Sequence, residues 1–570
     1  MNIVKKTFGL AFRYAPFFTI GIFLLGFLQS MGSGIIVLQT QRVFDIIGSA
    51  ITNKNNVDPA LCSLIILFVI MMILHLLNGL QNYLYDVYIM FTRNKFSQIM
   101  SDKSSRINAE AYEKAAFLDL LNKAKIGMEN SVELILVFGD IFTYYLPYFI
   151  FMMIYLVNIQ TSFILFLLLI FLPVLLSQII RIKLFSNLEH QSANYRRQLS
   201  YFDSCICDKE YIKETRSLNA TTFFIGKLKE LLKNINTIET SVNKKMSLVE
   251  MLLDFMTLAG YLCILMMLII CLKNGDISLG AFAAIYSSLS RIFQMMEEIL
   301  RYHIGQLSEN IGSIQNFISF LEYEERTDSK KEQRLTSLKL HHVDYQYPET
   351  EREVLKDINL ELHANQSIAV VGKNGSGKTT LSKILLGLYT PTRGELILNG
   401  EVCENKANLQ TACLFQNFQR YKLNLLENIK ISDLDSTASV DNLLSYFNLN
   451  QLDPKIVLSP DFGGADLSIG QWQRVSMARA FYKKADFIVL DEPTASIDPI
   501  EENSFYEKFH DLSSDKTSIV IIHHLVSAKY ADLILVMENG QITERGTHEE
   551  LMKQKGIYYT MFTTQKDSYE

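Results

Sequence analysis

Six long apolar stretches in the first 300 residues constrain this chain more than any other feature. A helix needs about 20 mostly apolar residues to cross the hydrocarbon core of a membrane. The stretches of that length are 16–38, 62–90, 132–157, 161–183, 248–272 and 279–300. The last carries Arg291, Glu297 and Glu298, which either line an aqueous cavity or have left the bilayer. No small-residue cleavage pattern follows the first stretch, so an uncleaved span is favoured over a signal peptide.

Lys and Arg are concentrated in alternate loops, which sets the expected orientation. They crowd the N-terminus, the loop between spans two and three, and the loop between spans four and five. Because cytosolic loops are the basic ones, we expect a multi-pass plasma-membrane protein with both termini in the cytosol. Helical periodicity in the two long loops predicts that the spans continue below the membrane and turn near 112–122 and 205–217. These tips either receive force from a soluble domain or are simply amphipathic cytosolic helices.

The second half of the chain has a different sequence pattern. After a charged linker, residues 323–337, short apolar runs alternate with Gly turns, as in an α/β domain. The predicted organisation is a six-helix membrane domain over 1–322, with long cytosolic helical extensions, and a cytosolic α/β domain over 338–570.

The strongest motif runs from Gly372 to Thr379, between a strand-like run and a helix-like run. Its glycines let successive backbone N–H groups curve around a phosphate, Lys378 adds positive charge, and Thr379 offers a hydroxyl to Mg²⁺. The α/β domain over 338–570 is therefore predicted to be a phosphate-loop ATPase domain, with ATP and Mg²⁺ as cofactors. The candidate nucleotide-binding residues of this motif are Gly372, Asn374, Gly375, Ser376, Gly377, Lys378, Thr379 and Thr380.

A second apolar run, 487–490, ends in two acids. A carboxylate at a strand tip beside a phosphate loop holds Mg²⁺ or its water, a role we assign to Asp491. Glu492 is then placed to orient or activate the attacking water.

Between these motifs, Leu467-Ser-Ile-Gly-Gln471 resembles the LSGGQ signature of the ABC transporter family. The resemblance covers essentially the whole chain and implies that Ser468, Gly470 and Gln471 contact the phosphate of an opposite subunit. Ile469 departs from the family glycine and needs only to point outward for activity to survive. The resemblance also implies an adenine-stacking aromatic, a lid glutamine that senses Mg²⁺, a D-loop acid and a switch histidine. These are Tyr347, Gln416, Asp498 and His523, respectively.

The chain holds one copy of each motif, whereas a phosphate loop in this family faces the signature of a second domain. The resemblance therefore implies two chains head to tail with two composite sites. A homodimer is the simplest arrangement, because Glu492 and His523 are intact, and a heterodimer stays open. ATP would close the two ATPase domains, open the cavity outward, and hydrolysis would reset it.

The cargo is less constrained. The segments 417–421, 462–464 and 472–474 resemble those of Gram-positive peptide and bacteriocin exporters. We expect export of a peptide or amphipathic molecule, without a peptidase domain before the first span. Several alternatives stay open: export of a lipid, a lipid-linked sugar or a drug, an ATP-gated channel or sensor, and import. The six spans exclude a soluble ABC ATPase.

Polar and aromatic side chains in the spans have two explanations. They either line a path for an amphipathic cargo, or they form interhelical hydrogen bonds and interfacial anchors. They include His75, Asn78, Gln81, Asn82, Tyr85, Tyr144, Tyr145, Tyr148 and Tyr155.

Charge and cysteine content exclude other classes. A net charge of −6 offers no basic field for nucleic acid. The seven cysteines form no CxxC pair, so neither a zinc site nor a disulfide framework is indicated. Cys205 and Cys207 are best explained as reduced cytosolic thiols rather than as a redox or metal pair.

Overall fold

The computed structural model describes residues 2–53, 58–159, 162–299, 305–326, 334–403, 409–494, 506, 509, 513 and 515–567. The chain divides into two compact units, described separately here. One comprises residues 1–104 and 119–323, and the other comprises 105–118 and 324–570.

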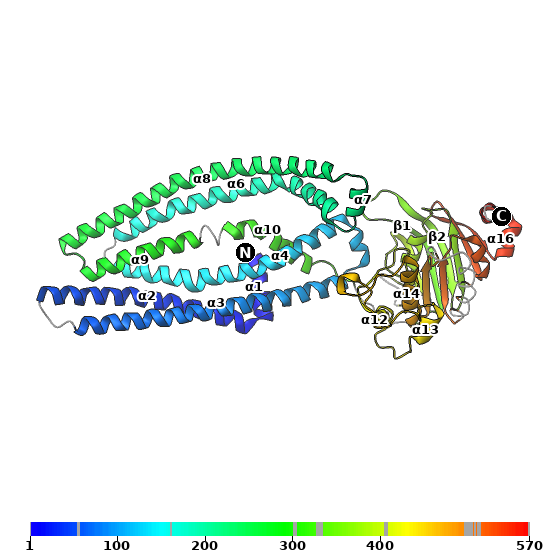
Figure 1. Cartoon of the computed structure of the whole chain (residues 1–570), viewed down its shortest axis with the longest axis horizontal. Helices are drawn as coiled ribbons and strands as arrows, with labels where there is room; N and C mark the ends of the chain where they lie inside the picture. Colours follow the sequence, from blue (N-terminus) through cyan, green and yellow to red (C-terminus); the bar gives the residue numbers. More distant parts are fainter. Residues whose placement is uncertain are drawn as a thin grey trace. The chain divides into compact units, whose positions relative to one another are not determined.

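The first unit is helical (Figure 1). Among the described residues, four helices are long and apolar enough to cross a membrane. They contain the first, second, third and fifth expected spans. The fourth expected span overlaps the first half of α6, and the sixth overlaps α9. The helices are α1 (Asn2–Tyr14), α2 (Pro16–Asn53), α3 (Asp58–Arg106), α4 (Ala115–Asp140), η2 (Ile141–Tyr145), α5 (Leu146–Ile159), α6 (Ser162–Cys207), α7 (Ile212–Ser217), α8 (Thr221–Asn274), α9 (Leu279–Glu297) and α10 (Gly305–Leu321).

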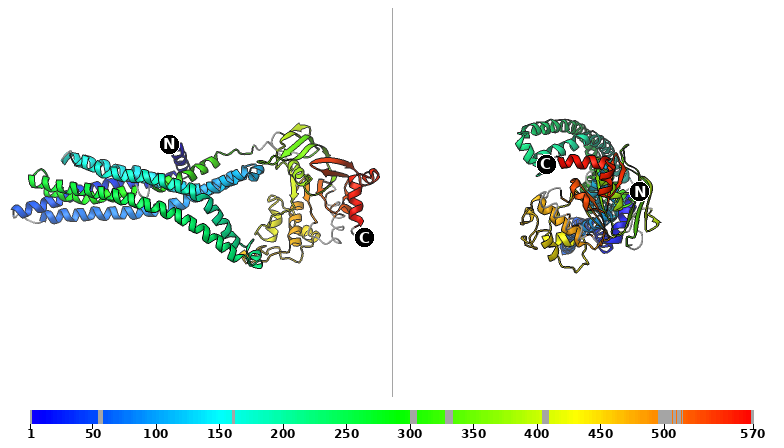
Figure 2. Two further views of the ribbon diagram at one scale, coloured as in Figure 1. Left: turned by 90° about the horizontal axis from the view of Figure 1, so that it is seen from above. Right: turned by 90° about the vertical axis from the view of Figure 1, so that its right-hand side faces the viewer.

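Within this unit α6 lies along α8, and α2 lies along α9 (Figures 1 and 2). The approach of α2 and α9 requires a glycine, because a Cβ at Gly280 would lie 2.0 Å from the Gln41 carbonyl oxygen. The Gly280 amide instead donates to Asp45 Oδ1 at 2.8 Å. The π-helical turn η2 interrupts the α4–α5 rod, and such turns often occur at functional sites.

The second unit is an α/β domain, as the sequence predicts. Its six-stranded sheet has the order β10-β9-β3-β8-β7-β6, with β9, β3, β8, β7 and β6 parallel and β10 antiparallel to β9. A four-stranded antiparallel sheet has the order β2-β1-β4-β5. The strands are β1 (Ser337–Gln346), β2 (Glu353–His363), β3 (Ser367–Gly372), β4 (Arg393–Leu398), β5 (Glu401–Val402), β6 (Thr411–Leu414), β7 (Phe487–Asp491), β8 (Thr517–Ile521), β9 (Leu533–Glu538) and β10 (Gln541–Gly546).

Short helices surround these sheets, and two buried apolar clusters form the core. The parallel strands β7 and β8 are buried at every residue, as expected when helices cover both faces of a parallel sheet. The helices are η1 (Ala109–Glu113), α11 (Lys378–Leu385), α12 (Leu425–Lys430), α13 (Asp441–Tyr446), η4 (Pro460–Phe462), α14 (Ile469–Tyr482), η5 (Leu525–Tyr530), α16 (His548–Gln554) and α17 (Ile557–Asp567).

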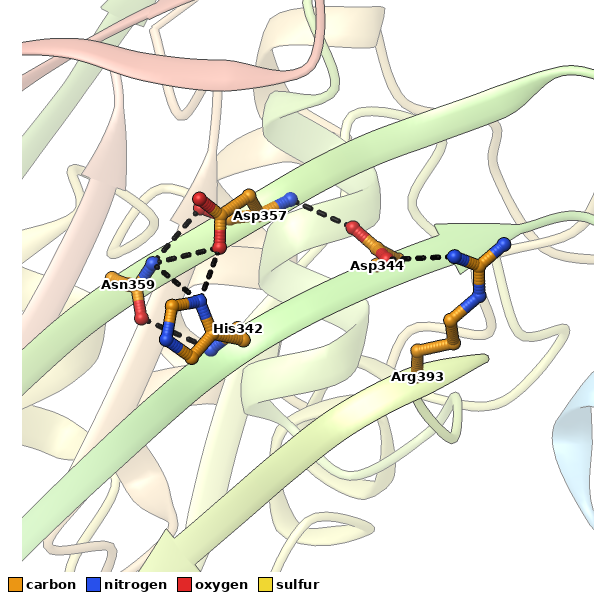
Figure 3. A network of polar contacts seen from close by, with 5 residues as sticks. All are labelled: His342, Asp344, Asp357, Asn359 and Arg393. Atoms are coloured by element: carbon orange, nitrogen blue, oxygen red, sulfur yellow. Dashed lines mark hydrogen bonds and ion pairs between the residues drawn. The ribbon is translucent and has the colours of Figure 1, made fainter.

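Strand β1 bulges at His342, where the register with β2 shifts and φ is +49° (Figure 3). Asn359 Oδ1 accepts from the His342 amide at 3.0 Å, and His342 Nδ1 lies 2.5 Å from Asp357 Oδ1. The hydrogen bond from His342 lowers the pKa of Asp357. Asp344 accepts from the Asp357 amide at 2.7 Å and lies 3.8 Å from Arg393. A bulge redirects the side chains that follow it, which here are the tyrosines at the end of β1.

Candidate nucleotide site

The phosphate loop lies between β3 and α11 and has backbone conformations that suit glycine. Gly372 and Gly377 have φ of +150° and +102°. A Cβ at Gly372 would lie 2.2 Å from Met537 O, and a Cβ at Gly377 would lie 2.7 Å from Leu355 Cδ2. The hydroxyl of Ser376 is buried without a hydrogen-bond partner among the described residues. The loop therefore presents a buried polar atom to an incoming phosphate.

Lys378 begins α11 and is only 7% exposed. Its Nζ donates to the carbonyl oxygens of Gly372 and Lys373 at 2.8 and 3.1 Å. Burial lowers its pKa, while the nearby acids act in the opposite direction. A polyphosphate would supply the negative charge that this buried ammonium lacks.

Asp491 ends β7 and is 1% exposed. Its Oδ2 accepts from Thr379 Oγ1 at 2.8 Å, whereas its Oδ1 is buried without a partner among the described residues. Burial raises the pKa of this carboxyl group. A hydroxyl and an unpartnered carboxylate oxygen are ligands that Mg²⁺ takes, so the residues present fit this ion.

Three side chains contact Glu492. Gln416 Nε2 donates to its Oε2 at 2.8 Å, and His523 Nε2 lies 2.5 Å from its Oε1. Gln473 Nε2 donates to its backbone oxygen at 3.2 Å. Its φ of +51° is unusual for a residue other than glycine, and such strain concentrates at functional sites. Sequence reasoning noted Gln473 only as part of a motif; its contact with Glu492 depends on the fold.

The signature residues lie at the start of α14. Ser468 caps the helix and forms a reciprocal capping box with Gln471. Gly470 is partly buried there, whereas Ile469 is 56% exposed, pointing outward as expected. Among the described residues, no hydrogen bond joins Ser468, Gly470 or Gln471 to the phosphate loop. Asp498 lies outside the described residues.

Tyr347 lies beside the phosphate-loop helix. Its hydroxyl is 3.1 Å from Thr380 Oγ1, and its ring packs edge-on against Tyr345 and Tyr389. A cavity of about 530 Å³ is lined by Gln346, by residues of the β1–β2 connection and of β2, by Gly375 of the phosphate loop, and by Asn539 and Gly540. Tyr347 and the residues of the phosphate-loop motif thus lie close together.

A family model described as ABC transporter matches residues 355–495, from β2 through the carboxylates that follow β7. This chain carries an ABC transporter ATPase domain. Subtilin transport ATP-binding protein SpaT of Bacillus subtilis is 31% identical over 64% of this chain and 62% of its own length. Nisin transport ATP-binding protein NisT of Lactococcus lactis subsp. lactis is 29% identical over 66% of each chain. The matches thus span slightly less than two thirds of these relatives.

A structure titled "Structure of a bacterial Atm1-family ABC exporter with ATP bound" superposes with a TM-score of 0.77. The match covers 96% of this chain and 98% of that one at 16% identity, so it establishes the fold. The chain has the ABC exporter fold, in which a helical membrane-type domain accompanies the ABC ATPase domain.

The ABC ATPase domain also holds a short segment from the first half of the chain, η1 and its flanks at 105–118. Glu110 Oε1 accepts from the Tyr345 hydroxyl at 3.3 Å, and its Oε2 accepts from the Thr390 amide at 3.4 Å. Glu113 accepts from the Tyr389 hydroxyl and lies 3.6 Å from Lys383 Nζ. Burial, with the nearby carboxylates, raises the pKa of both phenols, so they stay protonated donors. This contact joins the first predicted cytosolic tip to the tyrosines beside the phosphate loop.

Proposed function

We propose that this protein is an ATP-driven exporter in which hydrolysis at two composite sites between paired chains drives alternating access. The observation that carries the proposal is the arrangement around Asp491, the last residue of β7, and Glu492, the next residue, beside the phosphate loop. Asp491 contacts Thr379 at 2.8 Å, and Glu492 contacts Gln416 and His523 at 2.8 and 2.5 Å. These are the groups that phosphoryl transfer from ATP to water requires.

In this proposal each residue has a defined task. Lys378 and the amides of the phosphate loop bind the β- and γ-phosphates, and Thr379, Asp491 and Gln416 hold Mg²⁺, which would neutralise developing charge on the phosphates. Glu492 orients the attacking water, and His523 positions Glu492 and then contacts the γ-phosphate. Tyr347 supports the adenine.

The composite site needs a second chain. Ser468 is exposed, Gly470 and Gln471 are partly exposed, and none of the three makes a hydrogen bond to its own phosphate loop among the described residues. The Ser468 hydroxyl proton, the Gln471 side-chain amide group and the N-terminus of α14 can thus donate to the phosphates of another copy. We propose a homodimer, with Asp498 contributing at the interface.

We propose the plasma membrane as the location, with both termini in the cytosol, and a peptide or amphipathic molecule as the cargo. Similarity to two proteins whose names describe transport of subtilin and nisin supports peptide export.

The direct test is ATP hydrolysis by the purified chain alone in lipid, measured with peptides, lipids and drugs. We expect hydrolysis without any other chain and stimulation by an amphipathic peptide. Stimulation only by lipids or drugs would replace the proposed cargo. The absence of hydrolysis by the chain alone, despite an intact Glu492, would contradict the homodimer.

A further inference from the structure

A second pocket lies within the helical unit, far from the nucleotide chemistry in sequence. It is a cavity of about 330 Å³ between α2, α3, η2 and α9. It is lined by Gln29, Ser33, Ile36, Met71, Leu74, His75, Asn78, Tyr144 and Arg291. Its wall combines aliphatic side chains with a cation and several polar groups, the composition of a site for the head of an amphipathic molecule.

Arg291 is the charged residue of this wall. It lies about 18 Å along α9 from the first residue of that helix, Leu279. In a helix that spans a membrane this places the guanidinium inside the hydrocarbon region, where a charge is costly unless it faces a cavity. No carboxylate of the described residues lies within ion-pairing distance of Arg291. An unpaired cation at this depth indicates a functional site.

The geometry leaves most of the guanidinium available. Both of its hydrogen bonds come from Nη2, to Tyr144 Oη at 2.9 Å and to Ser33 Oγ at 3.3 Å. Nε and Nη1 therefore have no acceptor among the described residues. Because the two hydroxyl oxygens act as acceptors here, their own protons remain free to be donated into the pocket.

Gln29 supplies an independent observation. It is 7% exposed, and its Nε2 is buried without a hydrogen-bond partner among the described residues. A buried amide donor that lines a cavity without an acceptor costs free energy unless a ligand accepts from it. Asn78 adds a second amide donor, since its Oδ1 already accepts from Asn82 Nδ2 at 3.2 Å.

Three acids of the same helical unit are engaged elsewhere. Asp140 accepts from the Tyr85 hydroxyl, Glu298 accepts from the Tyr145 hydroxyl at 3.1 Å, and Asp45 accepts from the Gly280 amide. The pocket thus converges donors and a cation without a neutralising carboxylate.

We propose that this pocket binds the anionic head, a carboxylate or a phosphate, of the amphipathic cargo. The proposal rests on the proposed export function for the identity of its ligand as cargo. Arg291 pairs with the anion through its planar fork, while Gln29, Ser33 and Tyr144 donate to the remaining oxygen lone pairs. The apolar part of the cargo then lies against Ile36, Met71 and Leu74.

The test is equilibrium binding of three probes to the full chain in lipid nanodiscs without nucleotide. The probes are an N-dodecanoyl dipeptide with a free carboxylate, the same dipeptide as its terminal amide, and dodecyl phosphate. We expect at least one anion to bind about tenfold or more tighter than the amide, as a charge-assisted hydrogen bond allows. Preference for the carboxylate or the phosphate would identify a peptide terminus or a lipid-type head as the source.

Variants assign this preference to the pocket. Arg291→Gln should remove the difference between anion and amide, and Arg291→Lys, which keeps the charge without the fork, should retain part of it. Lys273→Gln is the matched control, because it removes one positive charge from the exposed end of α8 and should leave the preference intact. Equal binding of all three probes to the wild type, or a preference that persists in folded Arg291→Gln, would overturn the proposal.

This experiment separates the site from the transport function. Binding is measured without ATP, so an Arg291-dependent preference without ATP-driven transport would retain the site and overturn the export function. ATP-driven transport that does not depend on the charge of the probe would retain the export function and overturn the site.

Discussion

His523 Nε2 lies 2.5 Å from Glu492 Oε1, and the second oxygen of the same carboxylate accepts from Gln416 Nε2 at 2.8 Å. The residue that we propose to orient water is thus held by a side chain at each of its two carboxylate oxygens. Binding of ATP with Mg²⁺ must exchange at least one of these contacts, because the phosphate, the metal and the water need the same groups.

Gln416 should matter for hydrolysis through its contact with Glu492. Replacing Gln416 by Ala removes a hydrogen bond to a charged group, and such bonds are worth roughly 1.5–3 kcal/mol. We expect ATPase turnover to fall by about one to two orders of magnitude. The control is Gln419→Ala, an exposed glutamine three residues further along the chain. Equal turnover in wild type and Gln416→Ala would contradict a positioning role.

The buried carboxylate of Asp491 should lower the stability of the metal-free protein and should be needed to bind Mg²⁺. Burial raises its pKa, so the folded protein takes up this proton at a less acidic pH than the unfolded chain does. The contribution of this group to stability is therefore fully present below the unfolded pKa and is lost as pH rises through the folded pKa. At neutral pH we expect Asp491→Asn to raise the melting temperature of the metal-free protein by a few degrees, since about 1 kcal/mol corresponds to 2–4 °C for a domain of this size.

The same variant should lose its response to Mg²⁺. Added Mg²⁺ with ATP should stabilise the wild type against heat by mass action, and Asp491→Asn much less. A variant that is destabilised without metal, or that keeps the full Mg²⁺ response, would show that Asp491 has another role.

The signature isoleucine should be nearly neutral. Ile469 is 56% exposed in the first turn of α14, and the Ser468–Gln471 capping box holds that turn without it. Ile469→Gly costs about 1 kcal/mol of helix propensity and restores the family residue, so we expect ATPase rates to change only a few-fold. A hundredfold gain would show that the natural residue impairs the composite site.

Tyr389 should affect coupling more than hydrolysis itself. Its hydroxyl donates to Glu113 of η1, and Tyr389→Phe removes that donor while keeping the ring that packs on Tyr345. We expect basal ATPase within about twofold of wild type and a loss of stimulation by cargo, because a charge-assisted hydrogen bond of roughly 1.5–3 kcal/mol is lost. Tyr558→Phe, which removes a buried hydroxyl from α17 near His548, is the control. Full stimulation in Tyr389→Phe would remove η1 from the coupling route.

Local sequence determined much of what could be predicted. The phosphate loop, the acids after β7 and the signature are each continuous in sequence, and their strand or helix context follows from short apolar runs. The contact of Gln473 with Glu492 and that of Glu113 with Tyr389 were not predictable in this way. The second pair is 276 residues apart, and its approach depends on how the η1 segment packs on a sheet that is distant in sequence.

The bulge at His342 was missed for a similar reason. Its positive φ is held by Asn359 and Asp357 from the neighbouring strand, and no glycine marks it in β1. The glycine signal lies instead on β4, where a Cβ at Gly394 would lie 2.2 Å from the His342 carbonyl oxygen. The pocket around Arg291 was indicated only as polar residues on separate spans, because the packing of α2, α3 and α9 brings them together.

The most direct test of ATP-driven export measures ATP binding, ATP hydrolysis and ATP-dependent uptake of an amphipathic peptide in the same inside-out vesicles, for wild type and Glu492→Gln. We expect the variant to bind ATP while hydrolysis and uptake fall together by at least about a hundredfold, as expected for the loss of a general base. Wild-type hydrolysis in Glu492→Gln, or uptake that continues without hydrolysis, would contradict the account.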